Sequence, residues 1–303
     1  MTEERAVAIV GATASGKSAL AHEVARASEG YVEILCVDAM TVYRGMDLAT
    51  AKPTLEERRE VRYHLIDLVS ASEEFSVEQF QRRAREAAHE VWSRGHVVLY
   101  VGGTGLYGRA VIDQLEIPGR YPEVRAQLEA RAGGELTSLY GELARLDPIA
   151  ASRMEPSNER RVVRALEVTL GSGRPFSSFG SGLRTYPTTA VAQVGLRVDT
   201  ATLDARVEAR FRDWLARGLL DEVRALAASP AGLSKTARQA VGYRQLLAHV
   251  EQGAEFDACV DEALTQSRRL ARRQRSWFER DPRVAWFDDP AEARDHVRAL
   301  LGC

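Results

Sequence analysis

The fold of this 303-residue chain is decided by Gly11-Ala12-Thr13-Ala14-Ser15-Gly16-Lys17-Ser18, a stretch that fits the pattern G-x-x-x-x-G-K-[ST]. The apolar run Ala6–Val10 before it predicts a buried strand, and Ala19–Ser28 after it predicts a helix. A glycine-rich loop in this position turns backbone amides inward and adds the positive end of a helix dipole. The stretch therefore predicts a loop that binds phosphate groups. Lys17 would neutralise the terminal phosphate and the Ser18 hydroxyl would ligate Mg²⁺.

The residues that follow two other predicted strands indicate which chemistry the loop serves. The phosphate loop alone leaves open whether it binds ATP, GTP or another compound. The run His96–Val101 is followed by Gly102-Gly103-Thr104-Gly105, without the carboxylate that many motor and switch hydrolases use to hold Mg²⁺. The run Val32–Val37 ends next to Asp38, and in small P-loop kinases an acid so placed lies beside the acceptor hydroxyl. The pattern therefore favours group transfer over simple hydrolysis.

Strand-like and helix-like runs alternate along the chain, which is typical of a parallel sheet wrapped by helices. We expect an α/β fold, a P-loop NTPase-like parallel sheet flanked by helices, with a small all-helical insertion domain. Residues 1–117 and 185–303 would form the two parts of the core, the second with a basic C-terminal helix, and residues 118–184 the insertion. The Gly- and Ser-rich segment Gly171–Tyr186 predicts a return loop. The further expected strands are His64–Leu68, Val191–Val198 and Val284–Phe287, and the expected helices are Ser76–Arg94, Pro122–Arg131, Gly134–Leu146, Asn158–Leu170, Leu203–Arg217, Leu220–Ala228, Ala237–Glu251 and Asp257–Glu279.

Composition excludes several classes of protein. The 41 Lys and Arg against 43 Asp and Glu give a net charge of −2, so no overall positive field indicates nucleic acid binding. The 3 cysteines are too scattered for a disulfide framework or a zinc site, and we expect free thiols. The acidic start of the chain does not resemble a targeting peptide, and no apolar run approaches the roughly 20 residues that span a bilayer. We expect a soluble, cytoplasmic protein.

One local stretch is nevertheless strongly basic. Ser267–Arg283 is rich in arginine, with Trp277 and Phe278 among the charged residues. Arginines 268, 272 and 275 follow helical i, i+4, i+7 spacing, which suits contact with a phosphate backbone. The alternative is a charged helix face in contact with solvent.

Several further motifs together carry a family resemblance across most of the chain. These motifs follow the phosphate loop in the same order as in the tRNA dimethylallyltransferase family, also called tRNA isopentenyltransferases, and they resemble the motifs of that family. Departures occur at Ala12, at Ala39 and at Glu155-Pro156-Ser157-Asn158, none of which removes a group with an obvious chemical role. The motifs are Asp38-Ala-Met-Thr-Val-Tyr-Arg-Gly-Met-Asp47, Thr50-Ala-Lys-Pro53, Val101-Gly-Gly-Thr-Gly-Leu-Tyr107, Arg160-Arg-Val-Val-Arg-Ala-Leu-Glu167, Val241-Gly-Tyr-Arg244 and Arg268–Trp277.

The resemblance implies an enzyme that transfers a dimethylallyl group from dimethylallyl diphosphate to the exocyclic amine of the tRNA adenosine on the 3′ side of the anticodon. It implies Mg²⁺ as cofactor, diphosphate as product and a monomeric enzyme. Asp38 would act as general base and Thr104 would orient the amine or the bridging oxygen. For Asp38 the alternative is a carboxylate that caps the following loop.

The resemblance implies that an arginine in the predicted helix Leu203–Arg217 binds the diphosphate. Arg206 and Arg210 share a helix face, and we favour Arg210 because it precedes Phe211. The alternative for Arg210 is a solvent-exposed ion pair with Glu208 or Asp213. Lys52 lies in a motif but receives no role.

The resemblance also implies contacts with the tRNA anticodon stem-loop. The target base would have to leave the stack, which is least costly in a single-stranded loop. The implied contacts are Asp38, Ala39, Met40, Thr41, Thr104, Arg125, Arg160, Arg161, Val162, Val163, Arg164, Gln239, Ala240, Val241, Gly242, Tyr243, Arg244, Arg268, Arg272 and Arg275.

Two other functions use the same phosphate loop. A small-molecule or nucleoside kinase would use ATP, with the insertion as a lid and Asp38 activating a hydroxyl. A non-catalytic RNA-binding protein would use a nucleotide as a switch, which the missing carboxylate after Val101 disfavours. Neither accounts for the ordered series of motifs.

Overall fold

The computed structural model describes residues 4–180, 182–183 and 185–303. The chain divides into two compact units, one formed by residues 1–113 and 188–303 and the other by residues 114–187. The predicted insertion, residues 118–184, ends at a residue outside the described ones, and its boundaries stay a prediction. Among the described residues, no helix combines the length and the apolar composition that crossing a bilayer requires.

A six-stranded sheet forms the centre of the larger unit, as far as the chain is described, and every strand pair in it is parallel. The strand order is β4-β2-β6-β1-β7-β8, so β1 is flanked by β6 and β7. A separate pair, β3 (Tyr43–Arg44) and β5 (Val69–Ser70), is also parallel. The strands of the large sheet are β1 (Ala6–Val10), β2 (Val32–Cys36), β4 (Tyr63–His64), β6 (Val97–Gly102), β7 (Ala192–Leu196) and β8 (Val284–Phe287).

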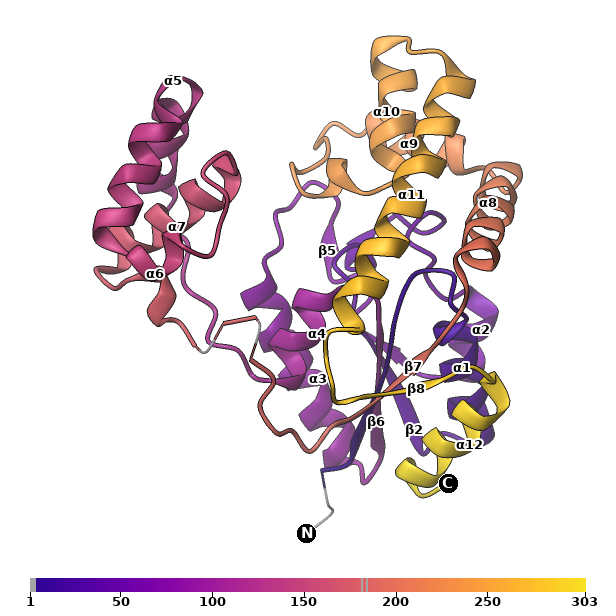
Figure 1. Ribbon diagram of the computed structural model, residues 1–303. Coiled ribbons are helices and arrows are strands. Elements are labelled where there is room, and N and C mark those ends of the chain that lie inside the picture. The colour runs from indigo at the N-terminus through magenta and orange to yellow at the C-terminus, as the bar shows by residue number, and fades with distance from the viewer. Residues whose placement is uncertain (1–3, 181, 184) are drawn as a thin grey trace. The chain divides into compact units, whose positions relative to one another are not determined.

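Helices cover both faces of the sheet, because alternate strand residues are apolar on each face. On β1, Val7 and Ile9 belong to one buried cluster and Ala8 and Val10 to another. The first cluster includes residues of α1 and α12, and the second includes residues of α3, α4, α9, α10 and α11 (Figure 1). The helices of this unit are α1 (Lys17–Ala27), α2 (Leu55–Glu60), α3 (Val77–Ser93), α4 (Gly105–Ile112), α8 (Thr200–Ala216), α9 (Leu219–Ala227), α10 (Tyr243–Gln252), α11 (Phe256–Phe278) and α12 (Pro290–Leu301), with a 3₁₀ turn at Ala237–Gln239.

The regular elements of the smaller unit, as far as it is described, are all helices. Its helices are α5 (Pro122–Leu146), α6 (Pro148–Ala151) and α7 (Glu159–Ser172), followed by a 3₁₀ turn at Phe176–Ser178. Leu139, Leu143 and Leu166 are fully buried in its core. The unit thus has an apolar core of its own.

The predicted fold class is confirmed, but several predicted elements are wrong in detail. His64–Leu68 is not one strand, because Leu65 and Asp67 have φ of 64° and 55°, which a strand cannot contain. Ala237–Glu251 is not one helix, because Gly242 at φ 92° separates the 3₁₀ turn from α10. The two helices predicted over 122–146 are one helix with a kink at Glu135. The sequence interpretation also missed α2, α4, α6, α12 and the pair β3–β5.

A buried carboxylate, Glu33, connects neighbouring strands of the sheet through hydrogen bonds. The side chain of Glu33, on β2, is 2% exposed and accepts hydrogen bonds from Arg94, His64 and His96, the last two at 2.6 and 2.7 Å. Burial raises the pKa of Glu33, but these hydrogen bonds outweigh it and leave the pKa below its ordinary value. Glu33 therefore joins β2 to β4 and to the start of β6.

Candidate functional site

The phosphate-binding stretch forms a loop between β1 and α1, as its sequence predicts. The loop needs unusual backbone conformations: Gly11 and Gly16 have φ of 141° and 98°. Ala14 also has positive φ, 65°, a region that non-glycine residues enter at some cost. Gly16 is the N-cap of α1, so Lys17 and Ser18 begin the helix. The loop therefore presents a helix N-terminus, where an anion is stabilised.

Two partly buried cations, Lys17 and Arg210, and the exposed Arg206 contact this loop. Lys17 Nζ donates to Ala12 O at 3.1 Å, and Arg210 Nη2, from α8, donates to Thr13 Oγ1 at 2.5 Å. Burial and the positive charge of Arg210, against the negative charge of Asp38, lower the pKa of Lys17 to about 8. Lys17, Arg210 and Asp38 are thus close enough to interact. Two adjacent cations at a helix N-terminus favour binding of a multiply charged anion.

Arg210 does not form the solvent-exposed ion pair that was its alternative. Its guanidinium carbon lies 4.8 Å from the centre of the Trp214 ring, and burial lowers its pKa to about 10. Its Nε atom is buried and has no hydrogen-bond partner within the described part of the chain. Glu208 and Asp213 pair instead with arginines other than Arg210. An unsatisfied buried donor beside the phosphate loop is available to a ligand.

Asp38 and Thr104 meet because their strands are neighbours. Asp38 follows β2 and Thr104 follows β6, and β6 lies between β2 and β1. Thr104 Oγ1 donates to Asp38 Oδ2 at 3.1 Å and lies 3.3 Å from Ala39 N, which donates to it. Asp38 Oδ1 accepts from Met40 N at 2.8 Å, so Asp38 also caps the loop that follows it. The carboxyl ends of these strands, where α/β proteins bind ligands, thus bring a carboxylate and a hydroxyl next to the phosphate loop.

The role of Lys52 is clear from its contacts. Its side chain is 1% exposed, and Nζ donates to Tyr43 O, Asp47 Oδ1 and Asp67 Oδ1 at 2.6, 2.7 and 2.6 Å. All three donor positions of the ammonium are therefore satisfied. Lys52 holds the loop that follows Asp38, and it has no free hydrogen for a ligand.

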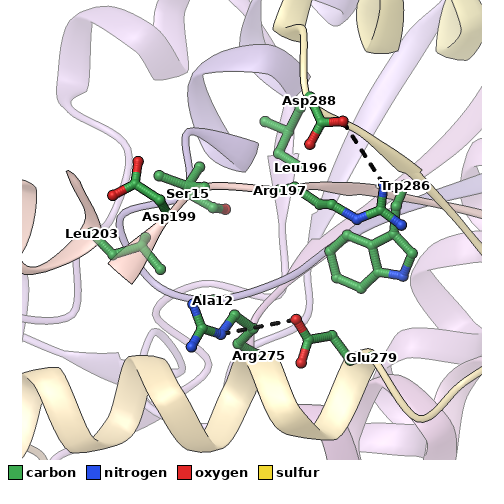
Figure 2. A pocket seen from close by; sticks show the side chains of 11 residues that line it. Ala12, Ser15, Leu196, Arg197, Asp199, Leu203, Arg275, Glu279, Trp286 and Asp288 are labelled. Carbon is green, nitrogen blue, oxygen red and sulfur yellow. Dashed lines mark ion pairs between the residues drawn. The ribbon is translucent and has the colours of Figure 1, made fainter. Parts of the chain in front are cut away.

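A cavity of about 240 Å³ adjoins the phosphate loop on another side (Figure 2). Figure 2 shows Arg275 on α11, Glu279 at the C-cap of that helix, and Trp286 on the side of the cavity away from Ser15. Asp38 and Thr104 do not line it. The cavity is therefore separate from the place where the carboxylate meets the phosphate loop.

Comparison with known proteins assigns the family. The IPP transferase family pattern matches residues 41–281. The chain is 45% identical over 297 residues to a tRNA dimethylallyltransferase of Salinispora arenicola, with 97% of this chain and 86% of the relative covered. The chain belongs to the IPP transferase family. The resemblance inferred from the motifs is thereby confirmed, and the chain is an enzyme of the prenyltransferase class.

Other IPP transferase relatives agree in sequence and in fold. A tRNA dimethylallyltransferase of Kineococcus radiotolerans is 45% identical, with 97% of this chain and 95% of the relative covered. The crystal structure of a tRNA isopentenylpyrophosphate transferase from Bacillus halodurans has a TM-score of 0.70 and 34% identity, covering 99% of this chain and 97% of that one. A eukaryotic dimethylallyltransferase shares the fold, with a TM-score of 0.76 at 24% identity, and covers 98% of this chain and 78% of that one. The fold is therefore shared along almost the whole chain.

The arginine stripe predicted on α11 faces α8. Each of its three arginines donates to a side chain of α8, so these arginines join two helices of the IPP transferase core. Arg268 and Arg275 are partly buried at this contact, whereas Arg272 is exposed and keeps donors for a further partner. The contacts are Arg268 Nη2 to Glu208 at 2.9 Å, Arg272 Nη2 to Asp204 at 2.7 Å and Arg275 Nη1 to Thr200 Oγ1 at 3.0 Å.

Two neighbouring arginines of α11 are exposed, as Arg272 is, but make no polar contact with the described residues of α8. Arg269 and Arg273 are exposed, lie four residues apart and form no ion pair with any described residue. The sequence interpretation counted them in the basic run but not among the predicted RNA contacts. Arg269 and Arg273 differ from Arg268 because α8 covers a different face of α11. No local sequence signal indicates which face of α11 a distant helix covers.

The segment 239–244 mixes exposed and buried positions. Gln239 and Arg244 are exposed, Val241 is partly buried, and Ala240 and Tyr243 are 3% and 1% exposed. The Tyr243 hydroxyl donates to Glu222. In this segment the side chains that can reach a partner from outside are therefore mainly Gln239 and Arg244.

Glu222, which accepts from Tyr243, also binds the loop after Asp38. Glu222 accepts from the Asp47 and Leu48 amides. Thr41 is 5% exposed, and its Oγ1 has no partner among the described residues. Ala39 and Met40 are half-buried.

In the smaller unit, two predicted RNA contacts are engaged with a buried acid. The Glu167 side chain is 1% exposed and accepts from Arg125 at 3.2 Å, from Arg164 at 2.8 Å and from the Tyr121 amide at 2.9 Å. Arg125 also pairs with Glu129. Arg125 and Arg164 therefore stabilise the packing of α5 against α7.

The next residues of α7 separate into two groups. Val162 and Val163 are 0% and 1% exposed and belong to the core, so their side chains do not face solvent. Arg160 and Arg161 are exposed and form no ion pair within the described residues. These two arginines are the free cations of the predicted set in this unit.

Proposed function

We propose that this enzyme transfers the dimethylallyl group from dimethylallyl diphosphate to the exocyclic amine of the adenosine adjacent to the anticodon on its 3′ side in tRNA. The observation that carries the proposal is the meeting of a diphosphate-type cradle with the Asp38–Thr104 pair. The cradle suits the leaving group and the pair suits the amine. The names of the relatives, tRNA dimethylallyltransferase and tRNA isopentenylpyrophosphate transferase, support the same reaction.

The phosphate loop would bind the diphosphate and stabilise its charge as it leaves. The backbone from Gly11 to Gly16 surrounds the anion, and Lys17 and Arg210 supply fixed positive charge. Donors aimed in advance at a developing charge lower the barrier without rearrangement during the reaction. The unpartnered Nε of Arg210 gives one further donor for this purpose.

Mg²⁺ fits the proposal as cofactor. The Ser18 hydroxyl is exposed at the start of α1, in the position where such loops ligate the ion. The described residues contain no group of three or more His, Cys, Asp or Glu that could hold a metal ion, so phosphate oxygens and water would complete its coordination. When bound, the ion would neutralise part of the diphosphate charge.

Asp38 would act as general base toward the amine. The adenine amine is a weak nucleophile, because its lone pair is delocalised into the ring. As its nitrogen bonds to C1 of the dimethylallyl group, the C1–oxygen bond to diphosphate breaks and one amine proton passes to Asp38. Thr104, which donates to Asp38 Oδ2, would orient the amine at the carboxylate. The products are isopentenyladenosine and diphosphate.

The exposed cations are the proposed tRNA contacts. Arg160 and Arg161 belong to the smaller unit, which we propose as a tRNA-contacting domain, and Arg244 belongs to the larger one. Arg269 and Arg273 extend the predicted set on α11. The remaining predicted tRNA contacts stay predictions. A monomeric, cytoplasmic enzyme completes the proposal.

A labelling experiment tests the reaction. The enzyme is incubated with Mg²⁺, labelled dimethylallyl diphosphate and an unmodified anticodon stem-loop that carries adenosine on the 3′ side of the anticodon. We expect label in the RNA, and none when this adenosine is replaced by guanosine. Absence of label in both RNAs, together with ATP consumption on addition of small hydroxyl compounds, would instead support the kinase alternative, which no present observation favours.

A further inference from the structure

Helix α11 lies directly against the phosphate loop. Small side chains allow this approach, because Ala271 is 1% exposed and is buried in one cluster with Ala12 of the loop. Three residues further on, Gln274 reaches the loop backbone, and its Oε1 accepts from Thr13 N at 2.8 Å. The hydroxyl of the same threonine accepts from Arg210 at 2.5 Å. Thr13 is therefore held at its amide by α11 and at its side chain by α8.

The Gln274 amide reaches a second loop with its other end. Because the Thr13 N–H is a donor, Oε1 has to face it, and Nε2 then points the other way. A Cβ built on Gly103 would lie 2.7 Å from Nε2 and 3.2 Å from Gly11 O, so only a glycine fits at 103 without displacing the amide. The Gln274 side chain thus lies between the phosphate loop and the loop that follows β6.

Trp277 supports the same loop on the other side of Thr104. A Cβ on Gly105 would lie 2.2 Å from Trp277 Nε1. Gln274 and Trp277 are three residues apart and share a helix face. Glycines 103 and 105 therefore let α11 contact the loop on both sides of Thr104, whose hydroxyl donates to Asp38.

We propose that Gln274 is a positioning residue, which sets the phosphate loop and the Asp38–Thr104 pair at the separation that transfer requires. Its Oε1 fixes Thr13 on the side of the leaving group, and its Nε2 packs on Gly103 on the side of the amine. The inference rests on the proposed function, because only a reaction between the two loops depends on their separation. A displacement of about 1 Å at reacting groups costs on the order of 100-fold in rate.

A pair of matched substitutions tests the role. Gln274→Met keeps the length of the side chain and removes both polar atoms. We expect kcat to fall by about 10–100-fold. The KM for dimethylallyl diphosphate should change by less than about threefold, because Lys17 and Arg210 still bind the anion. Gln266→Met is the control: Gln266 lies on the same helix and donates to Glu262 at 2.7 Å, away from the site, and kcat should not change.

A double-mutant cycle tests the same contact from its other end. In Gly103→Ala the new methyl group pushes the Gln274 amide away, and kcat should fall as it does in Gln274→Met. Gln274→Ala removes the closest contact of that methyl group and leaves only the contact with Gly11 O at 3.2 Å. The kcat loss of Gly103→Ala with Gln274→Ala should then be clearly smaller than the product of the two single losses.

The possible outcomes separate this inference from the proposed function. If the wild-type enzyme transfers no label to RNA, the proposed function fails and the positioning role fails with it. If the wild type is active and Gln274→Met retains its kcat, only the positioning role is overturned. A rise in KM at unchanged kcat would make Gln274 a binding residue and also overturn it, and so would losses that multiply in the double variant.

Discussion

Raising the pH from 7 to 9 should remove the charge of Lys17 in the free enzyme and weaken its capture of dimethylallyl diphosphate. The ordinary pKa of a lysine is 10.5, and in this fold burial and the neighbouring Arg210, against Asp38, lower it to about 8. A lowered lysine pKa means that the charged form is lost earlier as the pH rises. Arg210, whose pKa is about 10, stays charged over the same range.

The size of the effect follows from that pKa. With a pKa of about 8, roughly 90% of Lys17 is charged at pH 7 and roughly 10% at pH 9. If the charged form alone captures the diphosphate, kcat/KM falls about tenfold over these two pH units. The bound diphosphate stabilises the ammonium and raises its pKa in the complex. The fall should therefore occur in kcat/KM at a pH where kcat is still unchanged.

The assay is transfer of label to the stem-loop, with kcat and kcat/KM for dimethylallyl diphosphate measured from pH 7 to 9.5. Lys17→Met should give a low kcat/KM without the fall near pH 8. Arg206→Met is the matched control, because this exposed arginine also donates to the loop, to Ala14 O at 3.4 Å, and the fall should persist. A wild-type kcat/KM that is constant up to pH 9, or the same fall in Lys17→Met, would refute the reasoning.

Three further outcomes are expected. Asp38→Asn should lower kcat by about 10²–10⁴-fold, since the proposed general base is lost, while stem-loop affinity in a gel shift stays the same. Arg269→Ala and Arg273→Ala should each weaken stem-loop binding and lower its salt dependence by about one unit of slope, whereas Arg272→Ala, which removes an ion pair with α8, should change the slope less. Glu33→Gln should lower the free energy of unfolding in urea by about 1–3 kcal/mol, because Arg94, His64 and His96 lose their charged acceptor while remaining partly exposed to water.

Each of these expectations has a result that contradicts it. A folded Asp38→Asn enzyme with wild-type kcat would leave Asp38 only its loop-capping role. A larger change of salt slope in Arg272→Ala than in Arg269→Ala would show that RNA binds the face of Arg268, Arg272 and Arg275, as the sequence predicted. A Glu33→Gln variant as stable in urea as the wild type would show that the buried charge is not needed.

Local spacing predicted the phosphate loop and the two strand-end residues, because a strand, a turn and a helix N-terminus are adjacent in sequence. The strand ends at Asp38 and Thr104 converge for a topological reason, since neighbouring parallel strands end at the same edge. Sequence spacing failed where the answer depends on a distant partner. Arg268 faces α8, where its side chain pairs with Glu208. The contact of Gln274 with Thr13 joins residues that are 261 positions apart.

That separation also bears on how the enzyme is made. Thr13 is synthesised 261 residues before the side chain that accepts from its amide. Until then the loop after β1 lacks its contact with α11, and strand β8, which pairs with β7, follows later still. Contacts so distant in sequence close late, because the entropy of a long loop has to be lost first. On the ribosome, the centre that joins the two substrates is completed only after Gln274 has emerged.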